Sequence, residues 1–154
     1  MKPLALALLL ASFALPAGDP PGFYMWKSAE LKGFGKTLAP KINDKKMASQ
    51  SLASYGNYTF NVAHREATGE AEYHATQADI FIVQSGEATL VVGGEMVDGK
   101  TSAPNEMRGP SVKGGTEKKL GAGDVVTIPA KMVHQLKLDA GKEFTYFYVK
   151  VTQP

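Results

Sequence analysis

Four side chains that could bind a metal lie in two separate parts of this 154-residue chain. Glu72 and His74 are close neighbours, Asp79 follows shortly after them, and His134 lies far downstream. In a β-strand, residues i and i+2 point to the same side, so Glu72 and His74 are expected to share a face. The chain has no cysteine, which leaves imidazole and carboxylate groups as the donors for a transition metal. These residues therefore predict a divalent-metal site, provided that the fold brings the two parts together.

Each of these residues also has a simpler interpretation. A histidine at the start of a strand is often a hydrogen-bonded core residue, and an aspartate there often closes a turn. Glu72 has three open roles: metal ligand, hydrogen-bond partner of a ligand, or solvated edge charge. We interpret His74, Asp79 and His134 as the main candidate ligands, and Glu72 as a fourth ligand or a catalytic base.

His64 is a weaker candidate for acid–base chemistry. It alternates with polar residues on the same side as Tyr58, Phe60 and Val62, so this apolar face is expected to point into the protein interior. A packed or cavity-lining histidine is the alternative. Arg108 is expected to be either a solvated charge or a group at a pocket mouth that attracts an anion.

Short strands must position these side chains. Alternating or continuous apolar residues predict strands at 58–65, up to His74, at 80–83, 88–92, 124–129, 133–138 and 143–151. Phe81, Tyr146 and Tyr148 are expected to line their interior. Residues 95–122 predict a polar excursion with a short strand or two, and residues 25–56 give no clear pattern. Short strands without a long helix between them favour an all-β antiparallel sandwich or barrel.

Two glycine-bounded stretches resemble the motifs of the cupins, a family of small jelly-roll β-barrels. The first family motif runs Gly, five residues, His-x-His, three or four residues, Glu, six residues, Gly. Here the stretch from Gly69 to Gly86 has Glu72 in place of the first histidine and Asp79 in place of the glutamate, while His74 matches the second histidine. Gly69 stands closer to Glu72 than the motif requires.

The second family motif runs Gly, five residues, Pro-x-Gly, two residues, His, three residues, Asn. Gly123, Pro129 and His134 match it, whereas Lys131 replaces its second glycine and Leu138 its asparagine. The resemblance covers roughly residues 58 to 151. It implies a double-stranded β-helix, or jelly-roll barrel, with the motif residues converging inside.

The resemblance also implies a divalent transition metal, which cupins usually bind through three histidines and one glutamate. This chain offers two histidines and two carboxylates, a set that favours Mn or Fe, while Zn, Ni and Cu would compete by affinity. Cupins commonly pair through sheet edges, so a homodimer is one expected arrangement. Their functions include oxygenases, isomerases, lyases and binding modules.

The first residues have the layout of a secretory signal peptide: Lys2, an apolar run from Leu4 to Leu15, then small residues. The expected organisation is a signal peptide at 1–17, an N-terminal extension at 18–57 and a cupin barrel at 58–154. The apolar run is too short for a stable membrane anchor, and no cysteine offers a lipidation site. We therefore expect a periplasmic or secreted protein.

The formal net charge of +2 argues against a nucleic-acid partner, which would select a basic patch. A small-molecule ligand or substrate is the expected partner. Three functions stay open: metal-dependent chemistry on a small molecule, capture of a small ligand by a binding or sensory module with or without a metal, and a metal-free barrel in which Glu72 and Asp79 are structural.

Overall fold

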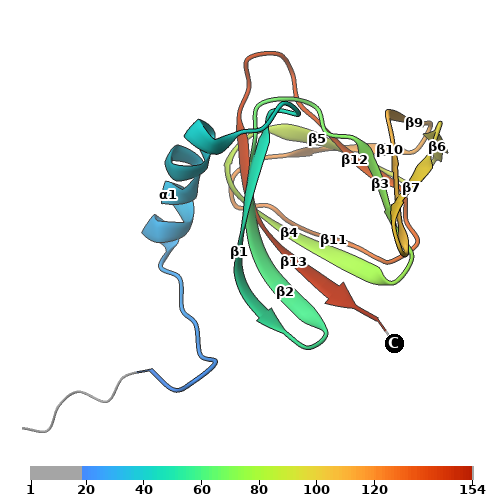
Figure 1. Ribbon diagram of the computed structural model, residues 1–154. Coiled ribbons are helices and arrows are strands. Elements are labelled where there is room, and N and C mark those ends of the chain that lie inside the picture. The colour runs from blue at the N-terminus through green and yellow to red at the C-terminus, as the bar shows by residue number, and fades with distance from the viewer. Residues whose placement is uncertain (1–18, 154) are drawn as a thin grey trace, which may run out of the picture.

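Two antiparallel sheets face each other in the computed structural model, which describes residues 19–153 (Figure 1). The predicted signal peptide lies outside these residues. The all-β antiparallel barrel is confirmed, and each predicted strand is present. The elements are α1 (Ser28–Leu38), the 3-10 helix η1 (Ala39–Lys41), β1 (Met47–Tyr55), β2 (Tyr58–Arg65), β3 (Ala71–His74), β4 (Gln77–Gly86), β5 (Ala88–Val92), β6 (Glu95–Val97), β7 (Lys100–Ala103), β8 (Glu106–Gly109), β9 (Ser111–Lys113), β10 (Thr116–Leu120), β11 (Val125–Ile128), β12 (His134–Lys137) and β13 (Phe144–Thr152).

The strand order explains how distant segments meet. One sheet has the order β1-β2-β13-β4-β11, and the other has the order β10-β5-β12-β3-β8-β7, while β6 and β9 form a separate pair. The chain passes from the second sheet to the first between β3 and β4, across Ala75 and Thr76. The residues of β3 and those of β4 therefore belong to different walls of one barrel.

The main core lies between the two sheets. Side chains from both inner faces form one buried cluster, to which Tyr148 and Met47 add partly buried surface: Ala63, Phe81, Val83, Ala88, Leu90, Leu120, Ile128, Leu136, Leu138, Phe144 and Tyr146. Leu138, which replaces the asparagine of the family motif, is part of this cluster. Burial of aliphatic and aromatic surface at roughly 25 cal/mol per Å² is the main favourable term for such a barrel.

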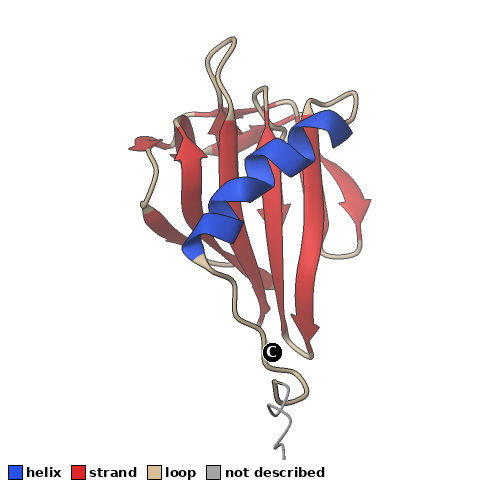
Figure 2. Cartoon of the chain, turned by 90° about the vertical axis from the view of Figure 1, so that its left-hand side faces the viewer, coloured by secondary structure: helices blue, strands red, loops and turns tan. Residues whose placement is uncertain are grey.

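Helix α1 covers the outer face of the first sheet, crossing β2, β13 and β4 (Figure 2). Leu38 is buried there in a second cluster with Ala48 and Val62. Because α1 covers this face, the apolar side of β2 points outward to the helix, and Ala63 and Arg65 point into the barrel. Within residues 19–153 no helix is long and apolar enough to cross a membrane.

The expectation that His64 points into the barrel is therefore wrong. Its ring lies under α1, where Gly35 approaches it, and its Nδ1 lies 2.9 Å from the Thr145 hydroxyl. The alternation of β2 was read correctly as a strand, but alternation does not say which face a helix will cover. His64 is separated from the barrel interior by its own sheet.

Residues 25–56, which gave no clear pattern, and the predicted polar excursion at 95–122 both add strands to the two main sheets. The expected N-terminal extension contains α1, η1 and β1, and β1 pairs with β2 at the edge of the first sheet. The polar excursion contains the short strands β6 to β10. Of these, β8 pairs with β3 and so brings Glu106 and Arg108 beside the predicted site.

Two motif positions have a positive φ, a backbone conformation that favours glycine. Gly86 has φ +81°, and a Cβ there would overlap the Glu143 carbonyl at the start of β13. Lys131 occupies the left-handed region, with φ 66°, where the family motif has glycine. The backbone of this loop thus follows the motif although the side chain does not. The Lys131 N–H donates to the His74 carbonyl at 2.8 Å, which ties the loop before β12 to β3.

Candidate metal centre

One row of side chains crosses the second sheet. His134 of β12 pairs with Glu72 of β3, and Glu72 pairs with Arg108 of β8. Directly paired residues on antiparallel strands point to the same face of the sheet. His74, two residues after Glu72, shares that face and pairs with Glu106. The register thus places two histidines, two carboxylates and a guanidinium side by side.

The first sheet contributes the groups that meet this row. Asp79 of β4 pairs with Lys150 of β13, and Asp79 is only 2% exposed. Phe81, Tyr146 and Tyr148 follow on the same inner face, as predicted. The two sheets therefore enclose Asp79 and Lys150 against His74, Glu72 and His134.

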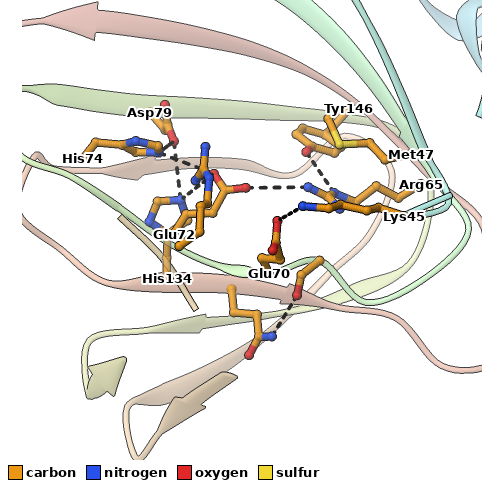
Figure 3. A network of polar contacts seen from close by, with 12 residues as sticks. Lys45, Met47, Arg65, Glu70, Glu72, His74, Asp79, His134 and Tyr146 are labelled. Carbon is orange, nitrogen blue, oxygen red and sulfur yellow. Dashed lines mark hydrogen bonds and ion pairs between the residues drawn. The ribbon is translucent and has the colours of Figure 1, made fainter. Parts of the chain in front are cut away.

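The four predicted residues converge on one point (Figure 3). The Nε2 atom of His74 lies 3.2 Å from Asp79 Oδ2 and 3.4 Å from Glu72 Oε2. The Nε2 atom of His134 lies 3.4 Å from Asp79 Oδ2 and 3.8 Å from Glu72 Oε2. One donor atom from each residue fits within a span of 4.8 Å.

In both histidines, the nitrogen that faces away from this point makes a hydrogen bond that fixes the orientation of the ring. His74 Nδ1–H donates to Glu106 Oε2 at 2.6 Å, and His134 Nδ1–H donates to the Met132 carbonyl at 3.1 Å. Since carboxylate and carbonyl oxygens only accept, these bonds fix Nδ1 as the donor on each ring. Such contacts are typical of metal-binding histidines, because they orient Nε2 towards the ion.

These residues fit a divalent transition metal. Ligand atoms about 2.1 Å from one ion lie about 3.0–3.4 Å apart in octahedral or tetrahedral geometry. The observed separations of 3.2 to 3.8 Å are close to this range. The Nε2 atom of His134 is buried and has no hydrogen-bond partner. A bound cation would supply the missing partner.

Both carboxylates of the centre stay ionised well below neutral pH. Burial by itself would raise the pKa of Glu72, but the hydrogen bond from His74 and the charges of Arg108, His134 and Arg65 together lower it to about 2. Burial likewise opposes ionisation of Asp79, but the close approach of His134 and His74 and the hydrogen bond from Lys150 hold its pKa below the usual range. Both ligand carboxylates are therefore negatively charged at neutral pH.

His74 and Lys150 are the two positively charged groups that contact Asp79. Burial lowers the pKa of His74, but hydrogen bonds to Asp79 and Glu72 outweigh it and raise the pKa to about 9, against the charge of Lys150. Lys150 Nζ donates to Asp79 Oδ1 at 2.8 Å and lies 3.0 Å from His74 Nε2. A metal ion would thus have to displace the proton from His74 Nε2 and tolerate a nearby ammonium.

A cavity adjoins this centre at Glu72. Its volume is about 550 Å³, and Arg65, Arg108 and Glu72 stand on its wall together with Lys45, Met47 and Glu70. A smaller hollow of about 80 Å³ lies deeper, between Glu72, Asp79 and Lys150. Small-molecule sites commonly have a volume of about 300–1,000 Å³, so the outer cavity is large enough for a small organic ligand.

The structure brings His74, Asp79, His134 and Glu72 together and leaves His64 apart. That the four bind a metal remains a prediction. Sequence reasoning missed Lys150, Glu106 and Arg65. The signal for Lys150 was its two-residue alternation with Tyr146 and Tyr148, which places a charge on the lining face. No local signal marked Glu106, because only the pairing of β8 with β3 brings it to His74.

The fold is also shown by solved structures. TT1209 from Thermus thermophilus has 17% identity and a TM-score of 0.54, with 77% of this chain and 94% of that chain covered. A protein with a double-stranded β-helix domain from Klebsiella pneumoniae has 17% identity and a TM-score of 0.53, with 71% and 80% covered. The cupin domain of Cnp3 from Schizosaccharomyces pombe has 14% identity and a TM-score of 0.52, with 75% and 67% covered.

At these identities the likeness shows the fold alone, and it confirms the cupin resemblance drawn from the two motifs at that level. No family model matches the chain. No curated protein matches it either.

Proposed function

We propose that this protein is exported and uses a divalent transition metal, held inside a cupin barrel, to bind and act on a small molecule. His74, Asp79 and His134 would hold the ion, with Glu72 as the fourth ligand. The single observation that carries the proposal is the convergence of these four side chains, with Nδ1 of both histidines already bonded elsewhere. Mn or Fe suits two imidazoles with two carboxylates, and Zn, Ni or Cu would compete for the site.

When bound, the metal would supply Lewis acidity or redox chemistry towards an oxygen-containing ligand. Residues of the chain orient the ligand side chains and shape the site. Glu106 and the Met132 carbonyl orient the two imidazoles. Phe81, Tyr146 and Tyr148 form the wall beside the centre and limit the access of water. The pKa of Tyr148 is raised to about 12, chiefly by burial, so its phenol stays protonated at neutral pH.

Two of the catalytic roles considered for this chain now have less support. Glu72, with a pKa of about 2, is a weak base at neutral pH, where an efficient general base has a pKa near the working pH. This favours Glu72 as a ligand. His64 lies under α1 and is out of reach of the cavity.

The low pKa of Glu72 also favours a second candidate function: a binding or sensory module that captures a small ligand at the same metal without chemistry. The two candidates share the metal and the cavity. Turnover of catechols, keto acids or sugars by the metal-loaded protein would support the first candidate. Stoichiometric binding without turnover would support the second.

The metal itself is tested by elemental analysis of tag-free protein from a native host. We expect close to one divalent transition ion per chain. His74→Ala and His134→Ala should each lose most of the metal and keep the far-ultraviolet circular dichroism of a β-barrel. Glu72→Gln should lose tenfold or more in metal affinity, since a ligand or a closely coupled partner is removed.

The matched control is His64→Asn, because His64 is also a buried histidine but faces the other side of its sheet. This variant should keep the full metal content. If both ligand variants retained wild-type stoichiometry, the proposed centre would be wrong. Localisation is tested separately, by fractionating the native host and sequencing the amino terminus of the isolated protein, where we expect the sequence to begin after Ala14 or Ala17.

A further inference from the structure

The chain contains only two arginines, and both approach the same carboxylate. Arg65 comes from β2 in the first sheet, and its Nη2 lies 3.7 Å from Glu72 Oε1. Arg108 comes from β8 in the second sheet, and its Nη1 lies 2.8 Å from Glu72 Oε2. Two sequence-distant guanidiniums thus stand on either side of Glu72, at the inner end of the cavity.

The neighbouring carboxylates leave these guanidiniums incompletely paired, although Arg108 Nη2 also lies 3.5 Å from Glu106 Oε2. The 3.7 Å separation puts Arg65 Nη2 beyond hydrogen-bond distance of Glu72. Arg108 Nη1 is close to Oε2, but it is buried and its N–H groups make no hydrogen bond of acceptable geometry. Buried donors usually have partners, so both arginines have capacity for a further acceptor.

Arg65 is held firmly in place for such a role. It is only 6% exposed, and its Nε–H donates to the Tyr146 hydroxyl at 3.3 Å. Gly69 lies against the guanidinium, where an added Cβ would come within 2.7 Å of Nη1. The planar, delocalised charge of arginine suits the two oxygens of a carboxylate better than a lysine ammonium does.

The net charge of the centre with a divalent ion bound also favours binding of an anion. Around the centre, the carboxylates of Glu72, Asp79 and Glu106 balance the cations Arg65, Arg108 and Lys150. With both histidines neutral as ligands, a divalent ion would leave two excess positive charges in a largely buried site. Uncompensated buried charge is costly, so an anionic ligand would be stabilised there.

We propose that Arg65 and Arg108 bind the carboxylate group of a small organic acid, which enters through the 550 Å³ cavity and lies beside the metal centre. This assignment rests on the proposed function and names its substrate class. Metal binding and acid binding assist each other. With Glu72 engaged as a metal ligand, Arg65 and Arg108 would lose part of their pairing with it, and the acid would take its place as their partner and offset the excess charge.

The test uses the full chain and succinate as the probe, with uncharged succinamide as its control. Isothermal titration calorimetry is performed on metal-free and Mn-loaded protein, in a buffer without carboxylate or phosphate, and corrected for chelation of Mn by succinate. We expect succinate to bind the loaded protein at least tenfold more tightly than the metal-free protein. Succinate should raise the affinity for Mn by the same factor, since coupling between two ligands is reciprocal.

Arg108→Gln is the main variant, because this side chain is partly exposed and its loss leaves the core intact. It should lose tenfold or more in succinate affinity and keep or improve its Mn affinity, since a cation beside Glu72 is removed. Arg65→Lys should also weaken succinate binding while keeping a charge. Lys119→Gln is the matched control, because Lys119 is an exposed cation that lines a different cavity, away from Glu72. It should bind succinate as the wild type does.

The outcomes separate this inference from the proposed function. If the wild-type protein did not bind Mn, the proposed metal centre would be wrong. Normal Mn binding with unchanged succinate affinity in Arg108→Gln would overturn the arginine site alone. Arg108-dependent binding of phosphate without binding of succinate, or equal binding of succinamide, would overturn the assignment to organic acids. Thermal unfolding of each variant shows whether a loss of binding comes from loss of the fold.

Discussion

Raising the pH from 7 to 9 should tighten metal binding about 50-fold, because a proton competes with the ion for His74 Nε2. The neighbouring carboxylates raise the pKa of His74 to about 9, so the proton must leave before this nitrogen can bind a metal. With a pKa two units above the pH, about 1% of the protein has the neutral ring at pH 7. The cost is about 2.7 kcal/mol at 1.36 kcal/mol per pH unit.

The pH dependence of the metal affinity should come from titration of His74 and not from titration of Glu72 or Asp79. The pKa of Glu72 is about 2, and that of Asp79 is also far below neutral, so both stay ionised throughout this range. The apparent association constant should therefore rise about tenfold from pH 7 to 8 and about fivefold from pH 8 to 9, and level off above that.

Two measurements check this slope. Competition with a chromophoric chelator gives the apparent affinity at each pH, after correction for protonation of the chelator. Calorimetry in buffers of different ionisation enthalpy gives the protons released, and we expect at least one per ion at pH 7 to 8. His64→Asn should show the same slope, since His64 lies outside the centre. A flat affinity from pH 7 to 9, or no proton release, would refute the assignment of His74 as a ligand that is protonated in the metal-free protein.

Four further predictions follow from the contacts around the centre. Lys150→Met should bind a divalent ion at least tenfold more tightly in the same competition assay, because the variant removes an ammonium that lies 3.0 Å from His74 Nε2. Even in water, charges of +1 and +2 about 5 Å apart repel by about 1.7 kcal/mol. Glu106→Gln should weaken metal binding by about 10- to 100-fold without unfolding the barrel, and an unchanged affinity would show that His74 needs no orienting carboxylate. Gly86→Ala should lower the free energy of unfolding in urea by at least about 2 kcal/mol, because its φ of +81° and the Glu143 carbonyl exclude a Cβ. The melting temperature of metal-free protein should be highest between pH 4.5 and 6.5: the lowered pKa of Glu72 gives stability that is lost from 4.5 towards 2, and the raised pKa of His74 gives stability that is lost from 6.5 towards 9.

Local patterns were sufficient to predict the strands between Tyr58 and Val92 and those after Asp124, and to identify the four residues that converge as candidates. Alternation in residues 58–65 and 143–151 reflects the two faces of a strand, a property of the backbone that does not depend on its neighbours. The pair Glu72 and His74 shares a face for the same reason. Gly86 and Gly123 have positive φ, so their motif positions also report a local backbone requirement.

Local patterns did not decide which face of β2 points inward. The apolar face with Val62 and His64 packs under α1, and the sequence did not reveal the position of this helix. The opposite face of β2 therefore points inward and places Arg65 in the interior. The same limit applies to Glu106 and Lys150. Each is an ordinary charged residue in the sequence, and each becomes part of the centre only through the pairing of its strand.

The sequence by itself thus determined the strands with clear alternation, the barrel class and the four candidate donors, because these follow from residue type, short spacing and the resemblance to the two cupin motifs. The tertiary structure alone decided the charges around those donors: Glu106 behind His74, Lys150 on Asp79, and two arginines on Glu72. The physical reason is that strand pairing joins residues far apart in the chain, and the electrostatics of a buried site depend on every charge that pairing brings within a few ångströms.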